Sequence, residues 1–120
     1  MAGRRKVWMF SPHSGGSRIP SALQEETRRR VLVHANEHYR GGFDRIHVWF
    51  RGQFCYIDAY QDGQAVPTHL CRLRYFSGHG NWSVAFYTYS HERYEPTFFE
   101  NGEDLGTPED GLDVGAVYLQ

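Results

Sequence analysis

The chain has 120 residues, of which 40% are hydrophobic and 16% aromatic, and its formal net charge is −1. This length matches one domain, residues 1–120, and this hydrophobic content excludes a wholly disordered chain. Two cysteines, Cys55 and Cys71, supply neither a disulfide framework nor the four ligands of a structural zinc site. We therefore expect both to be reduced residues of the core.

The charge is unevenly distributed along the chain. Residues 1–76 carry 12 Lys and Arg against 6 Asp and Glu, whereas residues 77–120 carry 1 against 8. The basic part can be a polyanion site guarded by the acidic tail, or the two parts can simply attract each other in the folded domain. The first twelve residues are basic and contain no apolar run of signal-peptide length, and no segment is long enough to span a bilayer. We expect a cytoplasmic protein without membrane contact.

In chain order, the first predicted element is a short strand over residues 6–10, followed by a loop over residues 11–17. That loop lacks the Gly-Lys-Ser/Thr ending of a P-loop, and nothing else in the chain indicates a cofactor. A helix is then predicted from Pro20, with Ser21 as its cap, to the Gly41-Gly42 pair. Its apolar stripe recurs every four residues at Leu23, Thr27, Val31 and Ala35.

Two alternating segments, residues 43–50 and 53–60, are separated by Arg51 and Gly52 alone, which predicts a tight hairpin. With that loop, Arg45 lies opposite Asp58, His47 opposite Tyr56, and Trp49 opposite Phe54. One face of the hairpin is then apolar and belongs to the core: Ile46, Val48, Cys55, Ile57 and Ala59. The other face is aromatic and charged: Arg45, His47, Trp49, Phe54, Tyr56 and Asp58.

Three further strands are predicted at residues 68–76, 82–89 and 93–99, and a last helix from Pro108 with Thr107 as its cap. In the first of these strands Cys71, Leu73 and Tyr75 face the core, and Leu70, Arg72 and Arg74 join the aromatic face. Leu112, Val117 and Leu119 are available for burial, although Gly111 and Gly115 weaken the last helix. The order β-α-β-β-β-β-β-α predicts an α+β domain: one antiparallel sheet of about five strands with an N-terminal and a C-terminal helix.

Four stretches together resemble a family of short bacterial proteins of unknown function: KVWMFSP at residues 6–12, CRLRY at 71–75, WSVAFYTY at 82–89 and ERYE at 92–95. The resemblance implies a stand-alone bacterial protein and brings no catalytic residue with it. It also implies that the recurring arginine and aromatic positions of the family fall on the aromatic face.

Two patterns carry catalytic chemistry. His34, Glu37 and His38 have the H-x-x-E-H form of inverted zinc peptidases, in which both histidines share a helix face and the glutamate is the general base. Here the third ligand would have to come from Glu92, Glu95 or the acidic tail. Histidines near a helix end are also explained by the helix dipole, so a zinc-dependent hydrolase is the least favoured alternative and we expect no metal site. His47, diagonal to Asp58, is a candidate general base, although Arg45 and Asp58 are equally explained as a cross-strand ion pair.

Binding is the favoured function. Arginines interleaved with aromatic residues on a sheet suit phosphate contacts together with base stacking. The leading hypothesis is a small module that binds a nucleotide or single-stranded nucleic acid. The alternative is a protein partner or a homodimer through the same face, since Tyr, Trp and Arg dominate protein interfaces. The candidate residues of the face are Arg45, His47, Trp49, Phe54, Tyr56, Asp58, Arg72, Arg74 and Tyr87.

Overall fold

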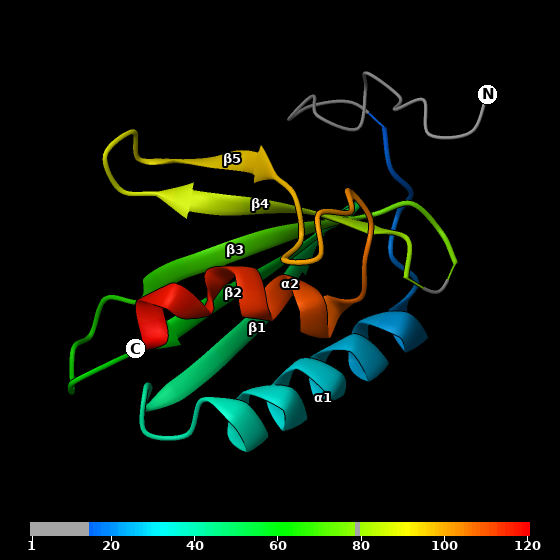
Figure 1. Ribbon diagram of the computed structural model, residues 1–120. Helices are drawn as coiled ribbons and strands as arrows, with labels where there is room; N and C mark the ends of the chain where they lie inside the picture. The colour runs from blue at the N-terminus through cyan, green and yellow to red at the C-terminus, as the bar shows by residue number, and fades with distance from the viewer. Residues whose placement is uncertain (1–14, 79) are drawn as a thin grey trace.

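The computed structural model describes residues 15–78 and 80–120. Along these residues the chain forms one antiparallel sheet of five strands in sequential order and two α-helices, followed by a short 3-10 helix, as Figure 1 shows. The α+β class and the order of these elements are as predicted. The elements are α1 (Ser21–His38), β1 (Arg45–Arg51), β2 (Phe54–Tyr60), β3 (Thr68–Tyr75), β4 (Trp82–Thr88), β5 (Arg93–Thr97), α2 (Pro108–Gly115) and η2 (Ala116–Leu119). The strand predicted at residues 6–10 lies outside the described residues.

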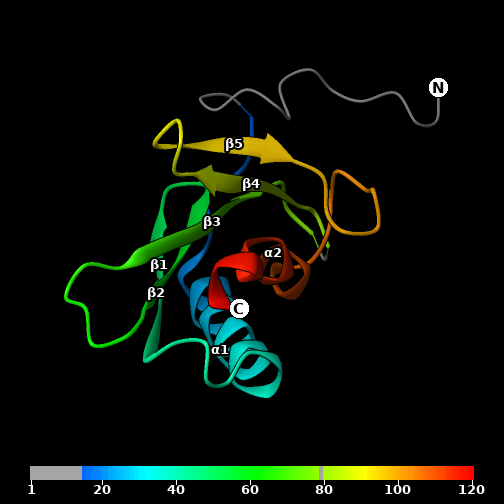
Figure 2. The ribbon, with the colours of Figure 1, turned by 60° about the vertical axis from the view of Figure 1, so that its left-hand side comes forward.

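Both helices cover the same face of the sheet. Figure 2 shows the sheet curving around α2, with α1 beside it on that side. The buried stripe of α1 is Thr27, Val31 and Ala35, as the four-residue spacing predicts, and Leu23 packs at its margin. Val31 and Ala35 meet the apolar side of the strands and Leu112 of α2 in one core cluster. The opposite face of the sheet has no described helix over it.

The close approach of α2 to β3 explains the two glycines that weaken its helix propensity. A Cβ atom at Gly111 would overlap the side chain of Leu73. A Cβ atom at Gly115 would lie 2.9 Å from the backbone of Leu70, which is also too close. Thr107 caps α2 as predicted, because its side chain accepts a hydrogen bond from the Asp110 amide. The expected burial is correct for Leu112 and Leu119 but wrong for Val117, which is exposed.

The predicted hairpin has the right faces and the wrong register. Arg51 pairs with Phe54, so the two loop residues are Gly52 and Gln53, and every cross-strand pair is displaced by two residues. Gly52 has a φ of +61°, and glycine in this conformation at the first loop position is typical of a type II′ turn. The displacement leaves both faces intact because the side-chain period of a strand is two. The buried face is Ile46, Val48, Cys55, Ile57 and Ala59.

A β-bulge changes the prediction for β3. The pairing of β2 with β3 shifts between Ile57 and Asp58, so that Ile57 lies opposite Cys71 and Asp58 lies opposite His69. Leu70 is the extra residue, and it is completely buried on the helix side. Its predicted place on the aromatic face was therefore wrong, and His69 takes that place.

The basic and acidic parts of the chain meet between the helices. Arg30 of α1 forms two hydrogen bonds with the Glu109 carboxylate of α2, at 2.6 and 2.8 Å. The N-cap of α1 is Pro20, without a side-chain hydrogen bond, rather than the predicted Ser21. Within residues 15–78 and 80–120, no helix is both long and apolar enough to cross a membrane.

Candidate functional site

The face of the sheet opposite the helices is called the open face below. Strand alternation places all nine predicted site residues on it, and the structure adds two that the prediction missed, His69 and Tyr94. Tyr94 lies directly opposite Tyr87 in the β4–β5 ladder, so alternation in the predicted strand at residues 93–99 was the signal for it. His69 had no such signal, because the bulge reverses its side.

An aromatic stack lies at the centre of the open face. Trp49 and Tyr56 are direct cross-strand partners, and their rings are stacked with centroids 3.9 Å apart and planes 8° apart. Tyr94 meets the edge of Tyr56 at 5.7 Å and that of Tyr87 at 4.9 Å. The rings therefore extend from β1 to β5 across the sheet. All four are half-buried, so part of each ring contacts solvent.

Arg72 lies within this aromatic group. Its guanidinium is 4.3 Å from the centre of the Phe54 ring and 5.2 Å from that of Tyr94, which are cation–π distances. No carboxylate in the described part of the chain forms a salt bridge with Arg72. The side chain is half-buried, so its charge is held in place by rings and is available to an anion.

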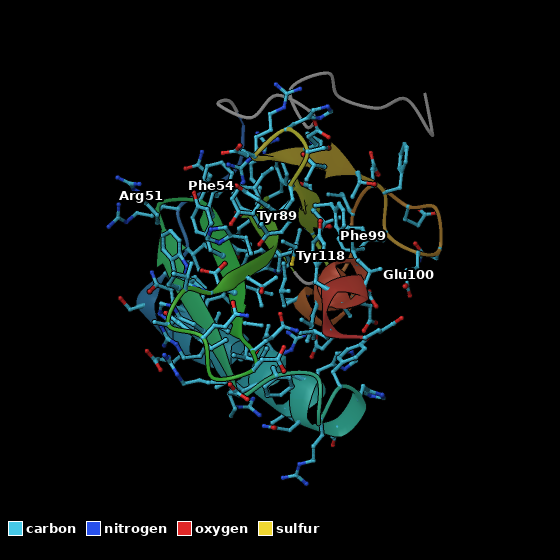
Figure 3. The ribbon with its side chains drawn as sticks, turned by 90° about the vertical axis from the view of Figure 1, so that its left-hand side faces the viewer. Arg51, Phe54, Tyr89, Phe99, Glu100 and Tyr118 are labelled. Carbon is cyan, nitrogen blue, oxygen red and sulfur yellow. The ribbon has the colours of Figure 1, made fainter. Side chains whose placement is uncertain are left out.

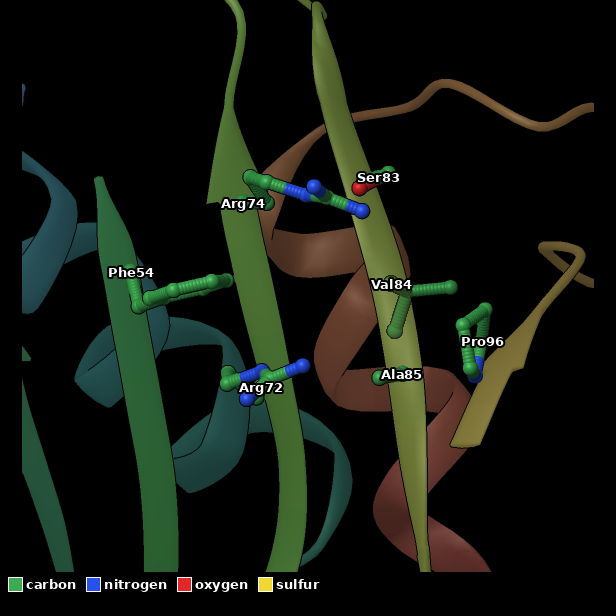
Figure 4. Close-up of a pocket in the computed structure, with 7 residues that line it drawn as sticks. All are labelled: Phe54, Arg72, Arg74, Ser83, Val84, Ala85 and Pro96. Carbon is green, nitrogen blue, oxygen red and sulfur yellow. The ribbon is translucent and has the colours of Figure 1, made fainter. Parts of the chain in front are cut away.

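Arg74 differs from its predicted role as a surface phosphate contact. It is 4% exposed, and Gly16 packs against its aliphatic stem. Burial, with a smaller contribution from the charge of Arg72, lowers the pKa of its guanidinium. Figure 4 shows Arg74 extending from β3 toward Ser83 of β4, while Arg72 lies over β3, and all three residues line a hollow. The hollow encloses about 10 Å³, which is room for one water molecule.

A buried carboxylate orients a histidine beside the stack. Asp58 is 3% exposed and accepts hydrogen bonds from Nε1 of Trp49 at 3.0 Å and from Nδ1 of His69 at 3.0 Å. The backbone amide of His69 donates to the Tyr89 hydroxyl at 2.6 Å, which fixes the residue further. Because Nδ1 is bound to the carboxylate, Nε2 is the ring nitrogen left for a ligand. The ring of His69 meets that of Tyr87 at 4.8 Å and remains about one third exposed.

Two predicted pairs on this face were wrong. Arg45 lies opposite Tyr60, with its guanidinium 4.2 Å from that ring, so it forms no cross-strand ion pair with Asp58. His47 lies opposite Asp58 rather than Tyr56, and it is exposed. The carboxylate that was expected to orient His47 is bonded to His69 instead. Both corrections follow from the two-residue displacement of the hairpin register.

The histidines of the H-x-x-E-H segment make contacts within α1 and with α2. Nε2 of His34 lies 2.8 Å from the Asp113 carboxylate of α2, which also accepts a hydrogen bond from the Tyr39 hydroxyl. The His38 ring lies 4.4 Å from that of His34, while Glu37 is exposed. Among the described residues, no three His, Cys, Asp or Glu side chains are arranged to hold a metal ion. Hydrogen bonding between α1 and α2 accounts for His34.

Both cysteines are free and fully buried, as predicted. Burial raises the pKa of each thiol well above its ordinary value. Cys55 and Cys71 therefore contribute packing rather than a nucleophile.

Larger hollows lie away from the open face. One of about 350 Å³ lies on the helix side of β4 and β5, where Val114 and Val117 line it, and Tyr118 stacks on Phe86 there. Tyr118 also meets Tyr89 edge-on, with ring centroids 5.3 Å apart, and both residues are labelled in Figure 3. The hollow on the open face, of about 10 Å³, is much smaller, and rings and guanidinium groups surround it.

Comparison with family models, with curated proteins and with solved structures finds no match for this chain.

Proposed function

We propose that the open face binds single-stranded nucleic acid. The observation that carries this proposal is Arg72, a half-buried cation held between the rings of Phe54 and Tyr94 without a carboxylate partner among the described residues. By strand alternation four arginines (Arg45, Arg51, Arg72 and Arg74) and one carboxylate, Asp58, lie on the face, which leaves three net positive charges with the histidines neutral. A phosphate is the complement of such a guanidinium, because the planar donors match its oxygens.

The rings supply the second half of the recognition. Trp49 and Tyr56 form a flat pair beside Arg72, and a base stacks on such a platform whatever its sequence. A base of a duplex has both faces covered by its neighbours, so this mode selects unpaired strands. The shallow relief of the face also favours an extended strand over a lone nucleotide, which is usually enclosed by a pocket.

The overall negative charge does not oppose this assignment. The acidic part of the chain is partly engaged elsewhere, since Glu109 pairs with Arg30 and Asp113 with His34 between the helices. The potential that a ligand meets is set by the local charges of the open face.

The test is fluorescence anisotropy with labelled single-stranded DNA and RNA of about ten nucleotides at two salt concentrations. Affinity should fall as salt rises, since each neutralised phosphate releases counterions. Arg72→Ala should weaken binding and reduce the salt slope by about one, and Trp49→Ala should cost about 1–3 kcal/mol. The matched control is Arg29→Ala, which removes an exposed arginine from α1 and should leave binding unchanged.

A protein partner or a homodimer through the same face gives a different result. Light scattering would then show an assembly that Trp49→Ala dissociates, with little dependence on salt. Oligonucleotides that fail to bind at low salt would contradict the nucleic-acid function.

A further inference from the structure

We propose that the open face also cleaves RNA, with His69 as the general base that takes the proton of a ribose 2′-hydroxyl. This inference rests on the proposed function, because the strand must first lie on the face. Its basis is the placement of two histidines on either side of one buried carboxylate, next to an arginine without a carboxylate partner in the described part of the chain.

The proposed general base, His69, is paired with Asp58. The carboxylate is buried and holds Nδ1 at 3.0 Å, so the neutral ring carries its proton on Nδ1 and presents Nε2 as an acceptor. The indole of Trp49 donates to the other carboxylate oxygen and prevents the group from turning. The bulge at Leu70 is what directs His69 to this face, and bulges often re-aim a side chain in this way.

The proposed general acid, His47, lies on the other side of Asp58. His47 lies directly opposite Asp58 in the β1–β2 ladder, and His69 lies opposite it in the β2–β3 ladder. The two histidine backbones are therefore two strand spacings apart, roughly 10 Å. Both side chains extend from the same side of the sheet, so a phosphodiester above Asp58 is within reach of each. Tyr94 is a poor proton donor, because burial raises its pKa.

The cation is Arg72, whose guanidinium is 5.2 Å from the ring of Tyr94, while the ring of His69 is 6.3 Å from that same ring. The base and the cation thus flank one aromatic side chain. A fixed guanidinium beside a reacting phosphate stabilises the additional negative charge of the transition state.

Together these groups supply the base, the acid and the cation that a transesterification of RNA requires. Nε2 of His69 takes the proton of the 2′-hydroxyl while the 2′-oxygen forms a bond to phosphorus. The bond between phosphorus and the 5′-oxygen breaks, and His47 acts as the general acid that gives a proton to that leaving oxygen. One fragment ends in a 2′,3′-cyclic phosphate and the other begins with a 5′-hydroxyl. DNA lacks the 2′-hydroxyl, so it is bound and remains intact.

The experiment uses a labelled DNA oligonucleotide with a single ribonucleotide and its all-DNA counterpart, in buffer with EDTA. The wild-type chain should cut the first at the ribonucleotide, with the cyclic phosphate identified by mass, and leave the second intact. With enough protein to bind all of the strand, His69→Gln should reduce the cleavage rate by about 100-fold or more. Arg29→Ala should cut like the wild type.

Asp58 is a positioning residue, and Asp58→Asn tests it separately. The indole of Trp49 can only donate, so the amide oxygen must face it and the amide nitrogen must face His69. His69 then accepts at Nδ1 and carries its proton on Nε2, which blocks the base. Nitrogen chemical shifts of the ring should show this exchange of tautomers, together with a lower kcat at unchanged KM.

Three results would overturn the inference. A wild-type chain that binds the strand without cutting it contradicts the cleavage alone and leaves the binding function standing. Equal cutting by His69→Gln would show that His69 is not the general base. Failure to bind the all-DNA strand would remove the proposed function and this inference together.

Discussion

Replacing Asp58 should destabilise the fold according to how many hydrogen bonds the substitute can keep. In Asp58→Ala, Nε1 of Trp49 loses the acceptor that lies 3.0 Å away, and Nδ1 of His69 loses one at the same distance. A buried donor left without a partner costs about 1–3 kcal/mol. The His69 side chain is 37% exposed and recovers part of its loss from water. We therefore expect a decrease of about 2–4 kcal/mol in the free energy of unfolding.

Asp58→Asn keeps an oxygen for Trp49 and a nitrogen for His69, so its cost should stay below about 1 kcal/mol. Urea unfolding followed by far-ultraviolet circular dichroism measures both variants, and an unchanged slope with urea ensures that the same transition is compared. Glu37→Ala is the matched control, because it removes an exposed carboxylate from α1 and should change stability by less than about 0.5 kcal/mol. An alanine variant as stable as the wild type, or an asparagine variant as unstable as alanine, would refute the reasoning.

Three further predictions concern the cap of α2, the ion pair between the helices and the buried cysteines. Thr107→Ala removes the cap of α2 and should lower stability by about 1 kcal/mol in thermal unfolding, whereas Thr107→Ser should preserve it. Burial opposes ionisation of Glu109, but the hydrogen bond and charge of Arg30 outweigh it and lower the pKa of this carboxyl. Glu109→Gln should therefore cost about 1 kcal/mol above the unfolded pKa, and urea titrations at falling pH should show the difference vanish through the lowered folded pKa. Cys55 and Cys71 should resist iodoacetamide in the native protein at neutral pH and react on unfolding, because burial raises the pKa of both thiols.

Residue alternation was sufficient to predict the two faces of the β1–β2 hairpin. Val48 and Ile57 are buried, and Trp49 and Tyr56 lie on the open face, although the predicted register was displaced by two residues. Alternation determines only which face of the sheet each side chain lies on, so it cannot detect a displacement of two residues. The conformation of Gly52 at the first position of the turn decides the register.

The detailed site could not be predicted, because it depends on contacts between strands. The bulge at Leu70 adds one residue to β3, and nothing in the pattern of residues 68–76 marks it. It moves His69 to the open face and so creates the contact with Asp58. Arg74 is likewise buried among residues that its strand pattern does not indicate, such as Gly16, which lies against its aliphatic stem and is far from it in the sequence.

The most direct test of the open face as a nucleic-acid surface is titration of the isotope-labelled protein with single-stranded DNA, followed by nitrogen–proton spectra. The indole signal of Trp49, whose Nε1 proton is bound to Asp58, should shift with increasing DNA, together with the amide signals of Tyr56 and Arg72. The indole signal of Trp82, which is 2% exposed on the helix side, is the internal control and should remain in place. Shifts confined to α1 and α2, or no shifts at low salt, would contradict the account.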